Sequence, residues 1–288
     1  MIRLRGGPRL GHERRYALPG LVAEDDLGSV WEAEDVFWRE PLTIRILSEP
    51  LSRDRRFLRR LREEVRPLSN PFLPASVARV LSYSYEPDGV PQFLVLEHME
   101  GEPLTHRLAG TAGLGVRGGL LLVSAVAEAL ATAHAAGLVH GDLKPRSVMV
   151  LAVGSVKLFD FGVAAALAEV RPQGAGLQGE GGGPGRATSE APGPRPEGDV
   201  SALARIARHL LPPARVERAL GEGGRRLLEV LERAARGEAV PTAGQFAAAV
   251  REALGRLGPD PQHPGADPLG EAGSGGQVAP WPGAAAPL

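Results

Sequence analysis

A short polar loop constrains this chain more than any other part of its sequence. The loop spans residues 140–147 and places Asp142 and Lys144 two positions apart. Two short apolar strands are predicted over residues 148–159, and a second aspartate, Asp160, follows them directly. One carboxylate can accept a proton from an attacking hydroxyl, the lysine can neutralise a transferred phosphoryl group, and the second carboxylate can hold Mg²⁺. The spacing therefore favours a site for a nucleoside triphosphate.

The same residues resemble a known family. The run His140-Gly141-Asp142-Leu143-Lys144-Pro145, followed by Asp160-Phe161-Gly162, is similar to the catalytic loop and metal-binding aspartate of the eukaryotic-like Ser/Thr protein kinases of bacteria. The resemblance covers about residues 12–256. It implies a bilobal α+β protein-kinase-like fold, with a small β-rich N-lobe, a larger helical C-lobe and a nucleotide cleft between them.

The predicted elements follow this division into lobes. Short strands around one arginine-rich helix occupy residues 15–99, and helices predominate over residues 100–256. Residues 1–14 form a polar lead-in, and the Pro/Gly/Ala-rich residues 257–288 are expected to be a disordered tail. The predicted strands are 27–33, 42–47, 77–85, 93–96, 148–153 and 155–159, with a hairpin turn at 86–89, and the predicted helices are 54–67, 120–135, 200–211, 224–235 and 242–254.

Composition excludes several classes of function. The formal net charge is −1, so neither nucleic acid nor a membrane is expected as a partner. The chain has no cysteine, which excludes disulfides and thiolate metal sites and fits a cytoplasmic location. The apolar run Gly119 to Ala136 contains Ser124, Glu128 and His134, and we expect it to be a buried helix rather than a membrane span.

The basic residues are strongly biased towards arginine. Of 33 Lys and Arg residues, only Lys144 and Lys157 are lysine. A lysine in the loop of such a chain indicates that a compact ammonium is needed at position 144. The resemblance implies that Asp142 is the catalytic base and that Lys144 stabilises developing charge. It also implies that Asp199, in Gly198-Asp199-Val200, is a buried aspartate that anchors the backbone of this loop.

The resemblance also assigns a metal and a nucleotide. Asp160 and Ser147 would hold Mg²⁺, although a serine hydroxyl is a weaker ligand than the asparagine usual in the family. Gly28, Val30 and Arg45 would contact ATP in the N-lobe. Leu96 and the residues after it, Glu97, His98 and Met99, would form the hinge facing adenine.

The N-lobe departs from the family at the phosphate-binding loop. The family's glycine-rich segment corresponds to residues 23–30, where only the last glycine, Gly28, is retained. Glu24, Asp25 and Asp26 instead place three carboxylates where anionic phosphates would pass, and they should repel them. This segment is a poor phosphate cradle.

A second departure concerns the cation that grips the phosphates. The strand lysine of the family is Arg45 here, and its planar guanidinium would bind phosphate with a different geometry. The helix glutamate that normally pairs with that lysine is Arg60 in one alignment and Leu61 in another. Glu63 and Glu64 could replace it only if the helix rotates or slides.

The C-lobe departs from the family as well. Gly141 replaces an arginine that often pairs with a phosphorylated activation loop. Residues 173–185 form a glycine-rich, flexible activation-segment insert, and the closing Ala-Pro-Glu of the family is Ala191-Pro192-Gly193. The arginine that would pair with the lost glutamate is Val240, and a threonine that normally contacts the catalytic aspartate is Arg186. Between Leu211 and Gly224 only a short connection is expected, where active kinases carry a helix for docking protein substrates.

Three functions remain open at this point. The first is a pseudokinase, a signalling or scaffolding module with a protein partner and at most weak Mg–ATP binding. The second is an active but atypical Ser/Thr kinase that transfers the γ-phosphate of ATP to protein hydroxyls. The third is a small-molecule phosphotransferase of the aminoglycoside or choline kinase type, because those enzymes also have His-Gly-Asp-Leu in this loop, although they differ at Lys144 and Ser147.

Overall fold

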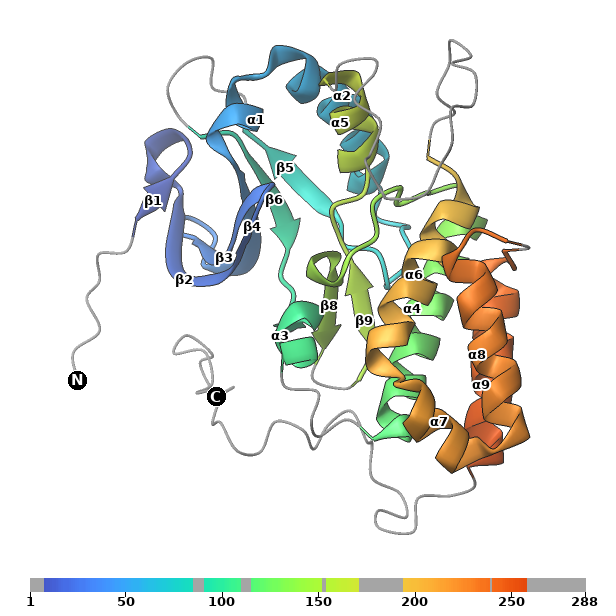
Figure 1. The fold of residues 1–288 in the computed structure, drawn as a ribbon. Coiled ribbons are helices and arrows are strands. Elements are labelled where there is room, and N and C mark those ends of the chain that lie inside the picture. Colours follow the sequence, from blue (N-terminus) through green and yellow to red (C-terminus); the bar gives the residue numbers. More distant parts are fainter. Residues whose placement is uncertain are drawn as a thin grey trace, which may run out of the picture.

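A computed structural model describes residues 8–84, 91–109, 115–151, 154–170, 194–238 and 240–257. The described chain has a curled, mainly β unit at its N-terminal end and a helical unit at its C-terminal end (Figure 1). The segment between β6 and β7 connects the two units. The predicted bilobal α+β fold is confirmed.

The N-lobe contains a six-stranded antiparallel sheet in the order β1-β2-β3-β4-β6-β5. Side chains alternate between its two faces, so Ile44 joins one apolar cluster with Phe93 and Val95, while Arg45 projects to the other face. Arg45 is there paired in register with Val30 on one side and with Leu94 on the other. The strands are β1 (Arg9–Leu10), β2 (Tyr16–Asp25), β3 (Gly28–Asp35), β4 (Glu40–Leu47), β5 (Val80–Tyr83) and β6 (Phe93–Glu97).

Two helices follow β4 in the N-lobe, α1 (Glu49–Arg53) and α2 (Arg55–Val65). The Asp54 side chain accepts hydrogen bonds from the backbone N–H groups of Arg56 (2.9 Å) and Phe57 (3.0 Å), which caps α2. Phe57, Leu61 and Val65 recur every four residues and are buried against the sheet. The predicted helix at this position is confirmed, and its last residues form a 3₁₀ turn, Arg66–Ser69.

The C-lobe is built around α4, which packs against α6 and α9 (Figure 1). Within the described residues, α4 is the one helix long and apolar enough to cross a membrane, but 61% of its most apolar 18-residue window is buried inside the protein. The prediction of a buried helix is confirmed. The helices are α3 (Leu104–Ala109), α4 (Val116–Ala135), α5 (Val163–Val170), α6 (Pro196–Leu210), α7 (Pro213–Leu220), α8 (Glu222–Ala235) and α9 (Ala243–Arg256).

A small sheet carries the polar loop at the junction of the lobes. Its strands are β7 (Gly101–Pro103), β8 (Val148–Leu151) and β9 (Val156–Leu158). The loop ends in a 3₁₀ turn, Pro145–Ser147, directly before β8. The sheet therefore holds the turn and the following Asp160 at the base of the N-lobe.

Some expectations differ from the structure. The connection predicted between Leu211 and Gly224 is wrong, because α7 forms there and buries Val216 against α8. The strand expected over 77–85 is limited to β5, with Val77 forming only an isolated bridge to Leu158. Part of the polar lead-in, Arg9–Leu10, pairs with β2. The hairpin turn at 86–89, the insert 173–185, position 186, the segment 191–193 and the tail lie outside the described residues.

Candidate functional site

A fully buried aspartate of α6 anchors the polar loop. Asp199 has no exposed surface and accepts hydrogen bonds from the backbone N–H groups of His140 (2.8 Å) and Gly141 (2.7 Å) and from His134 Nε2 (2.9 Å). The ring of His140 bonds through Nε2 to the carbonyl of Phe159 (2.9 Å). Burial outweighs the neighbouring carboxylates and lowers the pKa of His140, so its ring is neutral. The loop is thus tied both to α6 and to the residue before Asp160.

The two predicted catalytic residues contact each other. Lys144 Nζ lies 2.8 Å from Asp142 Oδ2. Both side chains are partly exposed, at 42% for Lys144 and 30% for Asp142. An ion pair at this exposure is weak, so both groups can exchange partners at little cost.

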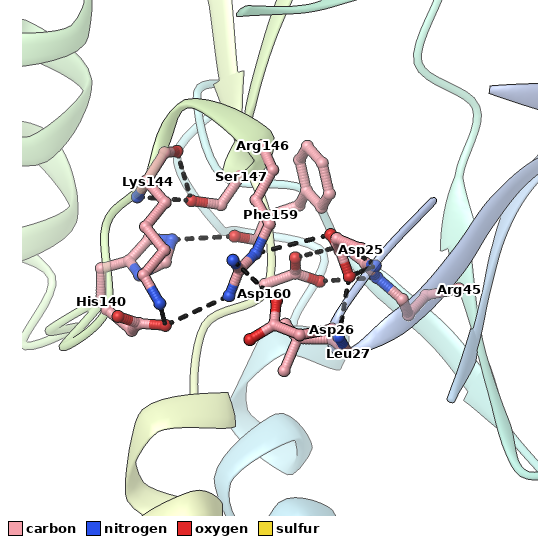
Figure 2. A network of polar contacts seen from close by, with 11 residues as sticks. Asp25, Asp26, Leu27, Arg45, His140, Lys144, Arg146, Ser147, Phe159 and Asp160 are labelled. Atoms are coloured by element: carbon pink, nitrogen blue, oxygen red, sulfur yellow. Dashed lines mark hydrogen bonds and ion pairs between the residues drawn. The ribbon is translucent and has the colours of Figure 1, made fainter. Parts of the chain in front are cut away.

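Arg45 spans the base of the site (Figure 2). Its Nη2 lies 2.5 Å from Asp160 Oδ2, and its Nε lies 3.2 Å from Asp160 Oδ1. Its Nη1 donates to Asp25 Oδ1 at 2.9 Å. The side chain is only 1% exposed. Burial alone would lower the pKa of Arg45, but the charges of Asp160 and Asp25 outweigh it and raise the pKa, so the guanidinium remains charged.

The backbone after β9 turns sharply to present Asp160 to Arg45. Asp160 has φ 66°, in the left-handed region that aspartate tolerates better than most residues. Gly162 follows with φ 80°, and a Cβ there would lie 2.5 Å from the Cβ of Glu64 on α2. This close approach lets α5 begin at Val163 and pack against α2, as Figure 1 shows.

A second arginine, Arg146, reaches the same carboxylates from the polar loop (Figure 2). Its Nη1 lies 2.8 Å from Asp26 Oδ1, its Nε 3.4 Å from Asp25 Oδ2 and its Nη2 3.4 Å from Asp142 Oδ2. Sequence reasoning missed Arg146. The available signal was a cation in the loop and an acidic turn without a partner.

The comparisons with known proteins agree with this geometry. The model of the family described as protein kinase domain matches residues 40–175. The serine/threonine-protein kinase PknA of Mycobacterium tuberculosis is 37% identical over 165 residues, which are 56% of this chain and 38% of that protein. The serine/threonine-protein kinase PknL of the same organism is 32% identical over 156 residues, which are 54% of this chain and 38% of that protein.

Residues 40–175 therefore match a protein kinase domain, and the described chain has the bilobal fold of that family. The aligned part spans well under half the length of these relatives. The resemblance places residues 140–147 at the catalytic loop of the family, Arg45 on β4 at the position of its phosphate-binding lysine, and α2 at the position of its N-lobe helix. Asp199 has the loop-anchoring contacts that the resemblance assigns to it.

The arrangement of this kinase domain does not fit a divalent metal. Both carboxylate oxygens of Asp160 accept hydrogen bonds from Arg45. Ser147 is 2% exposed, and its Oγ accepts from the Lys144 N–H (3.1 Å) and donates to the Lys144 carbonyl (2.8 Å). Mg²⁺ requires oxygen ligands in a near-ideal octahedron, and each side-chain oxygen of these two residues already has a hydrogen-bond partner, which for Asp160 is a cation. Within the ranges that the structure describes, no group of three or more His, Cys, Asp or Glu is placed to hold a metal.

The hinge of the kinase domain also uses its polar groups internally. The N–H of Met99 donates to Thr43 Oγ1 at 3.3 Å. The Glu97 side chain turns to Lys157 Nζ (2.5 Å) and Arg79 Nε (3.2 Å). Burial would raise the pKa of Glu97, but the bonds to Lys157 and Arg79 outweigh it and lower the pKa. Leu96 is 2% exposed, so its side chain joins the core.

The one retained glycine of the phosphate loop has a structural reason. Gly28 has φ 129°, and a Cβ there would lie 2.0 Å from the carbonyl oxygen of Ile46. Position 28 therefore requires glycine for the approach of β3 to β4, independently of any ligand. Val30, two residues on, is 1% exposed and packs in the core.

The N-lobe helix does not supply a carboxylate to Arg45. Leu61 is buried in the apolar core, and Arg60 lies on the outer face of α2. Arg60 pairs with Glu64 at 2.5 Å and with Glu63 at 3.5 Å. Neither alignment of the sequence thus gives the usual lysine–glutamate pair, and Asp160 and Asp25 take its place around Arg45.

Proposed function

We propose that this kinase domain is a pseudokinase, a signalling or scaffolding module that acts through a protein partner and does not transfer a phosphoryl group. The observation that supports it most is the bidentate ion pair between Arg45 and Asp160. Kinase chemistry needs the strand cation on the nucleotide phosphates and the aspartate on Mg²⁺. Here Arg45 and Asp160 bind each other instead of the phosphates and Mg²⁺.

Freeing Asp160 from Arg45 has a large cost in free energy. Freeing Asp160 for a metal means breaking a pair whose side chains are 1% and 3% exposed. Leaving one partner of a buried pair uncompensated costs about 3–5 kcal/mol. That cost corresponds to about two to four orders of magnitude in metal–nucleotide affinity. Negative charge beside the same pair is increased by three further carboxylates, those of Asp25, Asp26 and Asp142.

The test combines binding and transfer. We expect no thermal shift with ATP at millimolar concentration, with or without Mg²⁺, and no transfer of labelled γ-phosphate to the chain itself or to generic protein substrates. Arg45→Lys is the informative variant, because an ammonium cannot hold both carboxylates in the same fork. A Mg²⁺-dependent shift in the wild type that disappears in Asp160→Asn, together with labelled product, would refute the proposal.

An active atypical Ser/Thr kinase is the second candidate. The contact of Lys144 with Asp142 and the anchoring of the loop by Asp199 favour it, because phosphoryl transfer uses an aspartate beside the acceptor hydroxyl and a cation for the developing charge. It predicts labelled product that is lost in Asp142→Asn. The small-molecule phosphotransferase is supported only by the shared His-Gly-Asp-Leu, from which this chain departs at Lys144 and Ser147, and α7 occupies the region where no docking helix was expected.

A further inference from the structure

Arg146 connects two parts of the chain that belong to different lobes. It belongs to the catalytic loop, whereas Asp25 is the last residue of β2 and Asp26 follows it in the β2–β3 turn. We propose that Arg146 and these two aspartates form an interlobe lock, which holds the β2–β3 turn down on the catalytic loop when no nucleotide is bound. The lock goes beyond the proposed function, because closure is a property of the free chain and is measured without phosphoryl transfer.

The contacts of the lock are graded by burial. Asp25 is 12% exposed and Arg146 16%, so their contact at 3.4 Å is largely shielded from water. Asp26 is 69% exposed, and its closer contact at 2.8 Å lies at the rim. The shielded contact resists screening by salt, whereas the rim contact is weakened by it.

Asp25 is the central residue because both arginines use it. Arg45 donates to Asp25 Oδ1 from β4, and Arg146 approaches Oδ2 from the catalytic loop (Figure 2). The N–H of Leu27 also donates to Asp25 Oδ1 at 2.9 Å, which fixes the turn. Arg45 also pairs with Asp160, so a continuous series of ion pairs connects the β2–β3 turn to the residue that follows β9.

The lock and a phosphate-bearing ligand exclude each other. The cluster contains four carboxylates, of Asp25, Asp26, Asp142 and Asp160, and three cations, of Arg45, Lys144 and Arg146. An incoming phosphate would have to take a guanidinium from an aspartate and leave that carboxylate unpaired. The two aspartates thus stand where a nucleotide phosphate would otherwise bridge the lobes.

Hydrogen exchange of the free chain tests closure directly. We expect protection of the backbone N–H groups of the turn and of residues 146 and 147 in the wild type, and about tenfold faster exchange at both sites in Arg146→Ala, since losing charged hydrogen bonds costs about 1.4 kcal/mol or more. Arg146→Lys should lie between the two. The matched control is Arg208→Ala, which removes an exposed pair with Glu232 inside the C-lobe.

A second measurement looks for a gain of binding. Removing the lock carboxylates in Asp25→Asn plus Asp26→Asn should raise the affinity for ATP about tenfold or more, because two repulsive charges disappear and Arg146 becomes available. Asp26→Asn alone is compared with Glu24→Gln. Each removes one exposed charge at or next to the β2–β3 turn, but no ion pair of Glu24 occurs in the part of the chain that the structure describes.

The outcomes separate the lock from the proposed function. Equal exchange in the wild type and Arg146→Ala overturns the lock, as does an equal gain in Glu24→Gln and Asp26→Asn, which would show a general charge effect. Phosphoryl transfer by the wild type overturns the proposed function. If the double variant unfolds, the Arg146→Ala exchange data still decide whether the lock exists.

Discussion

Replacing Arg45 by methionine is the sharpest test of the charge cluster. Methionine retains the length and much of the volume of the side chain but removes every donor. Arg45 is 1% exposed and donates to both oxygens of Asp160 and to Asp25. Its loss leaves two poorly exposed carboxylates, 3% and 12% exposed, without their main partner.

The magnitude follows from this burial. Removing one partner of a buried ion pair costs about 3–5 kcal/mol, because the remaining charge is desolvated and unpaired. For a domain of about 250 residues, each kcal/mol corresponds to about 2–4 °C, so the melting temperature should fall by about 6–20 °C. Adding Asp160→Asn to Arg45→Met should recover about 2–3 kcal/mol of this loss, since the stranded charge is gone.

Urea unfolding of the wild type, the two single variants and the double variant gives the coupling energy. Arg208→Met is the control, because its pair with Glu232 is 52% and 40% exposed and should contribute about 1 kcal/mol at most. The reasoning is refuted by a cost below about 1 kcal/mol for Arg45→Met, or by single-variant effects that simply add.

Three further predictions concern the scaffold. Burial lowers the pKa of His140 below its usual 6.5, so below pH 6.5 the unfolded chain binds a proton that the folded chain does not. The stability that the neutral ring contributes is therefore complete above pH 6.5 and is lost as the pH falls below it. Urea midpoints at pH 7.5 and 5.5 measure the loss. Gly119→Ala should destabilise the fold by about 1–2 kcal/mol despite its gain in helix propensity, because a Cβ would lie 2.8 Å from a carbonyl oxygen of α6. Gly255→Ala is the control, because a Cβ there would have nothing within 4 Å, and it should stabilise the fold by up to about 1 kcal/mol. Thermal melts measure both variants. Gly28→Ala should cost about 3 kcal/mol, because of its φ of 129° and a contact of 2.0 Å with the Ile46 carbonyl; an unchanged melting temperature would show that the turn relaxes freely.

The elements with local signals could be predicted from the sequence. Asp54 marks the start of α2 and caps it, and Thr242 starts α9 with a capping box in which Gln245 takes part. The catalytic loop can be predicted because its motif consists of consecutive residues. Its anchor, Asp199, was found through the resemblance and lies where the loop needs a buried acceptor.

The remaining features depend on how distant segments approach each other. No local sequence pattern predicts the start of α5, because it depends on Gly162 lying close to Glu64 on α2. The short α7 is hard to predict, because it begins at Pro213 directly after Pro212, and a pair of prolines is as typical of a plain connection as of a helix start. Arg146 could not be assigned a partner without knowing how closely the β2–β3 turn approaches the catalytic loop.

The acidic turn and the arginine on β4 explain each other. On the sequence alone, Arg45 could be attributed to the bias of this chain towards arginine. The structure gives it a specific task, because its Nε and Nη2 hold Asp160 while Nη1 holds Asp25. A lysine ammonium at the end of a flexible stem has no fixed fork and would leave one of these carboxylates poorly bound. An arginine at position 45 therefore makes an aspartate at position 25 tolerable, and that aspartate in turn keeps the guanidinium away from any phosphate. The two departures from the family form one device, and reverting either alone should destabilise the domain before it restores a nucleotide site.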